Sequence, residues 1–383
     1  MSGMKDISSA PEKSDLPRAL PYWVSLGIVP LAWIAATMGG WTIILVPLAT
    51  WLLFSLLDRM IGLDQGNPDP DADESTMFWH RLVTLVWVPV QGLTIFGTIG
   101  LMVRSGQLTT VEMFAVAFGL GILSGTIGIV YAHELMHQKI RLERWMADVL
   151  MTLALYGHFR SEHLLVHHRY VGTPRDPVTA RYNESFYRFF PRVLHQCLVS
   201  SWRAEKAMLR RKGLPVWDRS NPFWRYVSLD LAWLLLALIV GGWMGVLLFL
   251  FQAFVAIWQL ELVNYVEHYG LTRKHLGQGK YEPQQPHHSW NAAQMASNRL
   301  LINLQRHSDH HYNPGRRFPL LQTYSSDEAP QLPHGYPVMT TLAMIPPLWR
   351  GKMNPRVRQW RAQFYPEITD WRPYAQAANP MPR

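Results

Sequence analysis

Six mostly apolar stretches constrain this chain more than any other feature of its sequence. They cover about residues 19–38, 41–57, 82–103, 110–132, 227–240 and 243–264. A bilayer core requires about 20 apolar residues per helix. Short connections join the stretches in pairs, so we predict an all-α integral membrane protein with six transmembrane helices in three hairpins. Only 16% of the 383 residues are Asp, Glu, Lys or Arg, and a soluble fold would have to bury six apolar helices at once.

The charge pattern predicts how the helices cross the membrane. Residues 138–225 hold sixteen Lys and Arg against seven Asp and Glu, and basic loops stay in the cytoplasm. We therefore expect both termini and the long polar segments on the cytoplasmic side of a bacterial inner membrane, and we expect no removed signal peptide. The expected divisions are a cytoplasmic segment (1–18), four membrane helices (19–137), a cytoplasmic insert (138–226), two membrane helices (227–266) and a cytoplasmic C-terminal region (267–383), which together form one catalytic domain with a helical cap.

Aromatic residues mark several ends of these apolar stretches, as expected for side chains at the membrane interface. They are Tyr22, Trp23, Trp41, Trp87, Trp233 and Trp243. The net charge of +9 suits an acidic protein partner or an anionic membrane surface. We expect contact with the lipid bilayer and none with nucleic acid.

Nine of the sixteen histidines form clusters beside the predicted cytoplasmic helix ends. His133 and His137 are spaced i, i+4 and project from one helix face. His163 and His167 share a face, whereas the neighbouring His168 lies about 100° around the helix, so the adjacent pair can serve two metals. The remaining candidates are His268 and a third cluster with all its rings on one face, His307, His310 and His311.

Eight or nine imidazoles exceed what one metal ion binds and fit two ions with four or five rings each. Imidazole suits Fe, Zn, Cu and Ni, so the ligands alone leave the metal open. A single cysteine, Cys197, excludes a cysteine-ligated centre within the chain. Carboxylates beside the clusters would orient the rings and offset the metal charge; they are Glu134, Glu162, Asp176, Glu267 and Asp309.

The other histidines are expected not to bind the metal. His80, His195, His275 and His334 are isolated in the sequence. His158 lies five residues before His163 and is the main rival, with a supporting role near the site. His287 and His288 lie in a proline-rich loop, which is a poor rigid platform for ligands.

At these residues the sequence resembles the integral-membrane alkane 1-monooxygenases. They belong to a histidine-rich membrane di-iron group that includes fatty-acid desaturases, hydroxylases and xylene monooxygenase. The resemblance covers about residues 20–350. Its longest strings are residues 264–271 (NYVEHYGL), 304–311 (LQRHSDHH), 167–177 (HHRYVGTPRDP) and 288–291 (HSWN).

The resemblance implies that the nine clustered histidines bind two non-haem irons. It further implies an enzyme of hydrocarbon degradation that uses O2 to convert medium-chain n-alkanes to primary alcohols, with electrons from reduced rubredoxin, itself reduced by a rubredoxin reductase. This chain has one cysteine, so we expect a rubredoxin, which needs four, to be either a separate protein or a fused domain outside this sequence. Val166 and Arg175 depart from the family pattern, which often has glycine and an acid there. The departures leave the ligands intact, but the resemblance does not fix the exact substrate preference and partner docking.

A linear alkane has no polar group, so its binding must come from apolar burial, about 0.8 kcal/mol per methylene. We expect a tunnel between the membrane helices and predict that Trp51, on the second of them, limits the length of the substrate. Lys139, Arg141 and Arg144 are the predicted docking residues for the reduced donor.

Several other functions fit parts of the pattern. A xylene-type methyl hydroxylase or a fatty-acyl desaturase would share the site and differ in its substrate. An intramembrane zinc protease would use His133, Glu134 and His137 as an HExxH motif, but most of the clustered histidines would then have no role. A metal transporter or sensor would not explain why the histidines gather at one membrane face.

Overall fold

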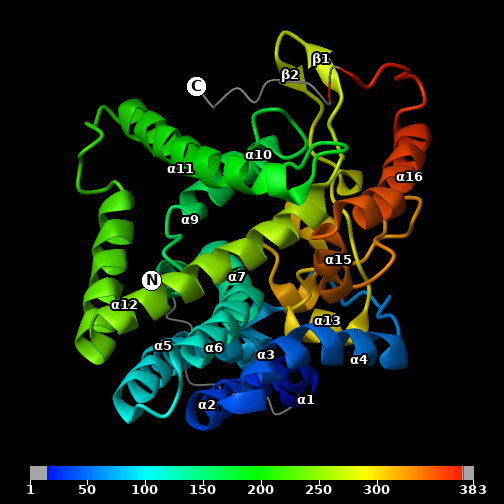
Figure 1. The fold of residues 1–383 in the computed structure, drawn as a ribbon. Coiled ribbons are helices and arrows are strands. Elements are labelled where there is room, and N and C mark those ends of the chain that lie inside the picture. Colours follow the sequence, from blue (N-terminus) through cyan, green and yellow to red (C-terminus); the bar gives the residue numbers. More distant parts are fainter. Residues whose placement is uncertain (1–14, 373, 375–383) are drawn as a thin grey trace, which may run out of the picture.

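A computed structural model describes residues 15–372 and residue 374, so the outer parts of the predicted segments 1–18 and 267–383 lie outside the described residues. The described chain is mostly helical, which confirms the predicted helical class (Figure 1). Within it, the strands form one small antiparallel hairpin of β1 (His275–Gly277) and β2 (Lys280–Tyr281), in which His275 pairs with Tyr281.

The helical elements follow one another along the chain, and short 3-10 or π-helical turns among them are labelled η. The N-terminal half contains α1 (Leu16–Ala19), η1 (Leu20–Ile28), α2 (Val29–Met38), η2 (Gly40–Ile44), α3 (Leu45–Pro47), η3 (Leu48–Leu53), α4 (Phe54–Ile61), η4 (Glu74–Thr76), α5 (Phe78–Ser105), α6 (Thr110–Leu123), η5 (Ser124–Gly128), α7 (Ile129–Met136), α8 (Arg141–Leu153), α9 (Phe159–Glu162), η6 (His163–His167) and α10 (His168–Tyr170). The C-terminal half contains α11 (Phe186–Arg211), α12 (Phe223–His268), η7 (Pro286–His288), α13 (Met295–Leu300), α14 (His307–Tyr312), η8 (Phe318–Leu320), α15 (Tyr336–Ala343) and α16 (Pro346–Phe364).

Five helical runs are long and apolar enough to cross a membrane: Leu16–Met38, Gly40–Ile61, Phe78–Ser105, Thr110–Met136 and Phe223–His268. The first four correspond to the first four predicted spans, and α12 contains both of the last two. The backbone leaves the helical conformation at Gly241 and at Gly242, whose φ is 58°. A Cβ atom on Gly245 would lie 2.5 Å from the Ala237 carbonyl oxygen. The two halves of α12 therefore fold back on each other, and Figure 1 shows the bend.

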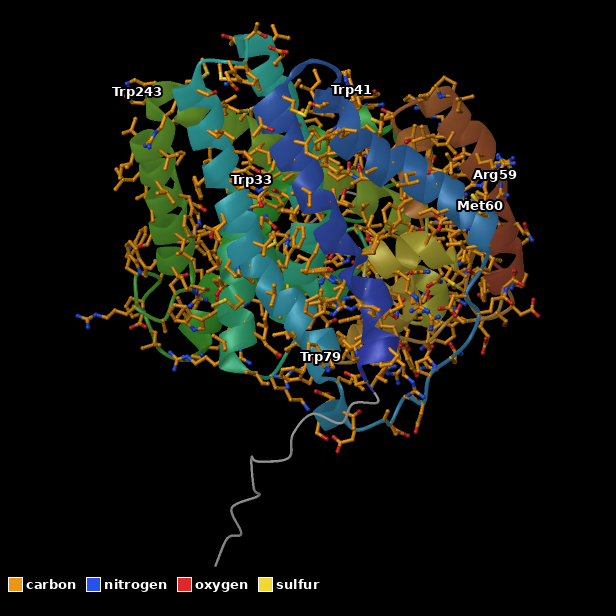
Figure 2. All side chains as sticks on the ribbon, turned by 90° about the horizontal axis from the view of Figure 1, so that it is seen from below. Trp33, Trp41, Arg59, Met60, Trp79 and Trp243 are labelled. Carbon is orange, nitrogen blue, oxygen red and sulfur yellow. The ribbon has the colours of Figure 1, made fainter. Side chains whose placement is uncertain are left out.

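Tryptophans that are exposed or partly exposed lie at the ends of the membrane-spanning body. Trp41 and Trp243 lie at one end and Trp79 at the other (Figure 2), and the first two are more than 70% exposed. This arrangement is typical of side chains at the two membrane interfaces.

Two of the predicted interfacial aromatics, Trp87 and Tyr22, are instead buried in the core. The Trp87 indole nitrogen donates to Gln91 Oε1 at 2.7 Å, and Asn303 Nδ2 donates to the Tyr22 hydroxyl at 2.9 Å. Because protein groups satisfy their polar atoms, these rings need no contact with the water interface.

The span formed by α6, η5 and α7 is the most completely buried of the five. Glycines on it allow neighbouring helices to approach closely. A Cβ on Gly121 would lie 2.7 Å from the Gln252 carbonyl oxygen, and one on Gly125 would lie 2.8 Å from that of Ala256. This close packing against α12 fixes the position of α7 and of the histidines that end it.

We expect Gly125→Ala to destabilise the protein, because the added methyl group meets backbone that cannot rotate away. Overpacking of this kind costs about 1–3 kcal/mol. Gly92→Ala is the matched control, since a Cβ at Gly92 in α5 meets nothing within 4 Å. Thermal unfolding in detergent should show a lower Tm for Gly125→Ala only; equal Tm values for the two variants would contradict the packing argument.

Candidate metal centre

Four separate parts of the chain bring the nine predicted histidines together. His133 and His137 lie in and just after α7, while His163, His167 and His168 lie in η6 and α10. His268 ends α12, and α14 carries the remaining three. The nine rings form two groups whose ligand nitrogens, within each group, all lie within 4.8 Å of one another.

The first group contains five histidines, namely His133, His137, His163, His168 and His310. His163 Nε2 lies 2.9 Å from both His137 Nε2 and His168 Nε2. His310 Nε2 lies 3.1 Å from His168 Nε2. We call this set the five-histidine group.

The second group contains four histidines, namely His167, His268, His307 and His311. His311 Nε2 lies 3.0 Å from His307 Nε2 and 3.2 Å from His167 Nε2. The nitrogens of His268 and His307 are 3.1 Å apart. We call this set the four-histidine group.

The division between the groups differs from the faces that helical spacing predicts. His163 and His167 do not share a group, because residues 163–167 form a π-helical turn and the His168 amide donates to the His163 carbonyl. This wider turn places His163 above His168 rather than above His167. In α14, His307 and His311 share a group, whereas His310 points to the other. The prediction that the adjacent His167 and His168 serve different metals agrees with this division.

The donor set fits metal ions better than it fits hydrogen bonding among the rings. His163 Nε2 contacts two other ring nitrogens, and a neutral imidazole has one proton to share between its two nitrogens. Nitrogens bound about 2.1 Å from a metal ion at right angles to each other lie about 3 Å apart, close to the spacings observed here. The nine rings are therefore suited to hold metal ions in two histidine groups.

Three rings of the five-histidine group are held in the uncharged form that binds metal. Burial, followed by the effect of neighbouring histidines, holds the pKa of His163, His168 and His310 well below the usual range. Ring nitrogens at pH 7 therefore keep lone pairs for a cation.

Two of the five predicted carboxylates contact these rings. Asp176 Oδ2 lies 3.0 Å from His167 Nδ1, and Glu267 Oε1 lies 3.3 Å from His307 Nδ1. Both carboxylates are buried. Asp176 can accept the outer N–H of His167 and leave Nε2 of that ring free to face the group. The Glu267–His307 contact is a close approach without hydrogen-bond geometry.

The other three carboxylates do not have the predicted contact with a ring. Gln138 Nε2 donates to Glu134 Oε1 at 2.9 Å. Asp309 binds Arg316 and the Gln322 amide instead, so it orders the segment after α14. Both oxygens of Glu162 are buried without a hydrogen-bond partner in the described chain, and burial raises the pKa of this carboxyl well above its usual range. Adjacency in the sequence did not predict these orientations.

A segment that the sequence did not assign to the site connects two ligand-bearing elements. The Trp290 amide donates to the Glu267 carbonyl at 2.9 Å, next to His268. Asn291 Oδ1 accepts from the Ser308 amide at 2.9 Å, next to His307. Residues 288–291 thus hold the end of α12 against the start of α14. The motif HSWN was visible in the sequence, but its contacts were not.

His287 and His288 form a third group with Glu282, yet its hydrogen bonds argue against a third metal. The Gln285 amide donates to His288 Nδ1 at 2.9 Å, which places the proton of a neutral ring on Nε2. That nitrogen lies 2.6 Å from the Tyr365 hydroxyl, so it donates to oxygen and has no lone pair for a cation.

The remaining histidines lie outside all three groups, as the sequence predicted for the metal site. His80 contacts Asp15 at 2.9 Å, and His158 packs its ring 4.6 Å from that of Tyr156. His195, His275 and His334 are exposed.

Buried imidazoles gathered at the ends of apolar helices define an integral membrane protein with a non-haem metal centre. A family model described as fatty acid desaturase matches residues 110–343. The chain is 39% identical over 328 residues to alkane 1-monooxygenase 1 of Pseudomonas aeruginosa, covering 83% of each protein. It is 36% identical over 367 residues to an alkane 1-monooxygenase of Pseudomonas putida, covering 93% of this chain and 90% of the relative.

A xylene/toluene monooxygenase hydroxylase component of Pseudomonas putida is 31% identical over 309 residues, which covers 78% of this chain and 80% of that protein. The chain therefore belongs to the alkane 1-monooxygenases, a family of oxidoreductases within the fatty acid desaturase group.

We expect Asn291→Ala to weaken metal retention by the four-histidine group, because His268 and His307 lose the segment that holds them together. Changes of residues that support ligands typically cost about 10–100-fold in metal affinity. Asn67→Ala is the matched control, since Asn67 makes a similar pair of bonds to the Thr323 backbone away from the site. Metal analysis after dialysis should show partial loss only in Asn291→Ala; equal metal content in both variants would contradict the assignment.

Proposed function

We propose that this protein hydroxylates the terminal carbon of medium-chain n-alkanes to primary alcohols, using O2 and electrons from reduced rubredoxin. The observation that carries the proposal is the convergence of nine buried or partly buried histidines into two groups in a chain of the alkane 1-monooxygenase family. A terminal C–H bond offers no acid, base or electrophile for a side chain to act on. Its cleavage requires a strong oxidant, which non-haem iron can generate from O2.

We propose two irons, one in each histidine group. The five-histidine group (His133, His137, His163, His168 and His310) would hold one, and the four-histidine group (His167, His268, His307 and His311) the other. Asp176 and Glu267 would orient two rings of the second group. Glu134 and Asp309 are not proposed for this role, because their observed contacts lie elsewhere. Glu162 is not proposed either, because its oxygens contact no ring nitrogen and have no hydrogen-bond partner in the described chain.

The protein's own residues contribute binding, orientation and exclusion of water. Apolar side chains of the membrane helices bind the alkane and leave one end of it beside the rings. Burial keeps the site dry, so the reactive centre meets the substrate rather than water. The product alcohol contains one oxygen atom of O2, and the other leaves as water after two electrons and two protons have been supplied.

We propose that the last two segments of the chain cross the membrane as a hairpin, which gives six crossings in total. The glycine turn in α12 at Gly241–Gly242 and the exposed Trp243 beside it support this topology. The termini, the insert 138–226 and the metal centre would then lie on the cytoplasmic side of a bacterial inner membrane. All nine histidines belong to one catalytic domain under this proposal.

A xylene-type methyl hydroxylase is the second candidate, favoured by the 31% identity to the xylene/toluene relative. Relatives named alkane 1-monooxygenase are more similar, at 36–39%. A fatty-acyl desaturase would share the same scaffold. A zinc protease is disfavoured, because Glu134, its required general base, is bound by Gln138.

Trp51 is the proposed limit on substrate length, and its contacts support that role. Its ring packs against Phe118 and Trp258, with centroids 6.2 Å and 6.3 Å apart. Trp51 therefore lies among the helices rather than wholly against lipid. The three rings together can close one end of an apolar channel between η3, α6 and α12.

We expect Trp51→Ala to extend the range of accepted alkanes by several carbons, because the truncated side chain opens the closed end. Competition assays with octane and hexadecane should show a higher yield of hexadecanol relative to octanol. Trp243→Ala is the control, since Trp243 is 77% exposed. Unchanged chain-length selectivity in Trp51→Ala would refute the assignment.

The charge pattern of the sequence predicts that the reduced donor docks on the basic turn after α7. Lys139 and Arg141 are exposed, whereas the Arg144 guanidinium donates to the Gln138 carbonyl at 3.0 Å. Arg144 thus binds the backbone of its own turn. Of the three predicted docking residues, Lys139 and Arg141 are the ones whose side chains are exposed to a partner.

Product analysis tests the proposed function directly. The purified protein, loaded with iron and supplied with O2, reduced rubredoxin and octane, should form 1-octanol. Parallel assays with p-xylene and a fatty-acyl substrate distinguish the alternatives. Formation of a methylbenzyl alcohol or a desaturated acyl chain, without 1-octanol, would overturn the proposal.

A further inference from the structure

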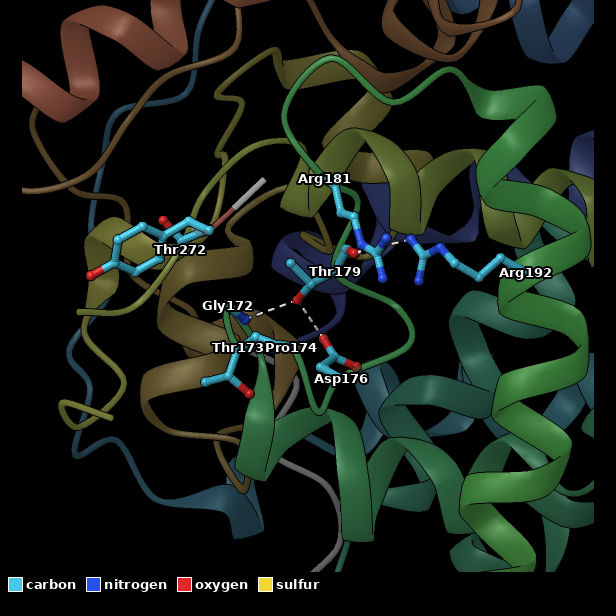
Figure 3. Close-up of a pocket in the computed structure, with 9 residues that line it drawn as sticks. Gly172, Thr173, Pro174, Asp176, Thr179, Arg181, Arg192 and Thr272 are labelled. Carbon is cyan, nitrogen blue, oxygen red and sulfur yellow. Dashed lines mark hydrogen bonds between the residues drawn. The ribbon is translucent and has the colours of Figure 1, made fainter. Parts of the chain in front are cut away.

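A small pocket on the polar side of the molecule reaches a residue that supports the metal centre. The loop after α10 and the start of α11 line it, together with the segment after α12 (Figure 3). Every lining residue lies in one of the two segments that we propose to be cytoplasmic. Asp176 lies at the pocket wall, and the same carboxylate contacts His167 of the four-histidine group.

Hydrogen bonds make this wall a fixed connection rather than a mobile loop. The Thr179 hydroxyl donates to Asp176 Oδ2 at 2.6 Å and accepts from the Gly172 amide at 2.9 Å. Asp176 Oδ1 also accepts from the Val178 amide at 3.0 Å. A group bound in the pocket is therefore separated from a histidine of the metal centre by a single ordered carboxylate.

The pocket has one positive charge that the described residues leave without a direct partner. Arg192 is neutralised by Glu184, with Nη2 and Oε2 2.8 Å apart. The Arg181 guanidinium, in contrast, makes no hydrogen bond or ion pair with residues 15–372 or 374. Burial, and then the neighbouring Arg192, lower the pKa of Arg181, and the weaker attraction of Glu184 does not offset them. This is the environment of a cation that lacks an anion.

An unused hydroxyl lies in the same pocket. Thr272 Oγ1 is buried and has no hydrogen-bond partner in the described chain. Two further arginines, Arg169 and Arg175, lie at the neighbouring surface with their guanidinium groups over the Tyr170 ring. A guanidinium and a hydroxyl that line one pocket can both donate to a carboxylate.

We propose that this pocket is the docking point of an acidic electron-donor protein, one of whose carboxylates pairs with Arg181 and accepts from Thr272. The inference rests on the proposed function and specifies its partner surface. Docking here brings the donor's redox centre to the Asp176–His167 side of the metal centre. Each docked donor gives up one electron and leaves oxidised. Two such donors and two protons balance the conversion of alkane and O2 to alcohol and water.

Steady-state kinetics with reduced rubredoxin as the varied substrate test the proposal on the iron-loaded protein. Arg181→Gln should raise KM for rubredoxin roughly tenfold and weaken its dependence on salt, because the variant lacks the steering charge. The kcat for octane should stay within about twofold, since the reacting groups are unchanged. Arg181→Lys should recover part of the affinity, and Thr272→Val should cause a smaller rise in KM.

Arg188→Gln is the matched control, because Arg188 is an exposed arginine near the start of α11 that does not line the pocket. It should leave KM unchanged. Arg141→Gln probes the rival surface on the basic turn. An unchanged KM in Arg181→Gln, or a rise in KM for Arg141→Gln alone, would overturn the proposal.

Two measurements separate this proposal from the proposed function. Iron content and Tm should match the wild type in every variant, and a loss of iron in Arg181→Gln would assign that residue to the metal centre instead. Binding of oxidised rubredoxin to the protein in nanodiscs does not depend on turnover. If the wild type forms no octanol, the proposed function fails. In that case weaker rubredoxin binding by Arg181→Gln than by the wild type still supports the docking site, and equal binding by the two proteins refutes it.

Discussion

Nine imidazole rings from four separate parts of the chain must meet at a spacing of about 3 Å, and the rest of the structure depends on this requirement. The close packing of α6 and η5 against α12, through Gly121 and Gly125, fixes the helices that deliver His133, His137 and His268. Asn291 and Trp290 then hold α12 against α14. The membrane helices and the polar segments thus act together, since neither part alone carries a complete histidine group.

The sequence predicted the helical class and the nine histidines, because both signals are local. Long apolar runs predict membrane helices, and histidines spaced by three or four residues predict a shared site. The division into groups could not be read in this way, since it depends on a π-helical turn at His163–His167, and helical spacing assumes an α-helix. The position of Trp87 in the sequence predicted an interfacial side chain, but its indole N–H donates to Gln91 within the core.

The contacts of the carboxylates were predicted less well than the clustering of the histidines. The reason is again that contacts depend on how the chain folds and not on spacing in the sequence. A carboxylate next to a histidine in the sequence points to another side of the helix, so Glu134 and Asp309 contact other partners. Asp176, nine residues from His167, reaches it because the intervening loop turns back. The HSWN motif was recognised in the sequence. Only the tertiary contacts show that Asn291 joins α12 and α14, the two elements that carry ligands.

The arrangement supports a division of access between the two sides of the metal centre. We propose that alkane arrives through the apolar helices and electrons arrive through the polar segments. The central claim beneath this scheme is that two irons are held by nine imidazoles. X-ray absorption at the iron edge of the loaded, active protein tests it most directly. We expect about two irons per chain, coordinated mainly by imidazole nitrogen; an active sample without iron, or one whose iron is bound mainly by carboxylate oxygen, would contradict the account.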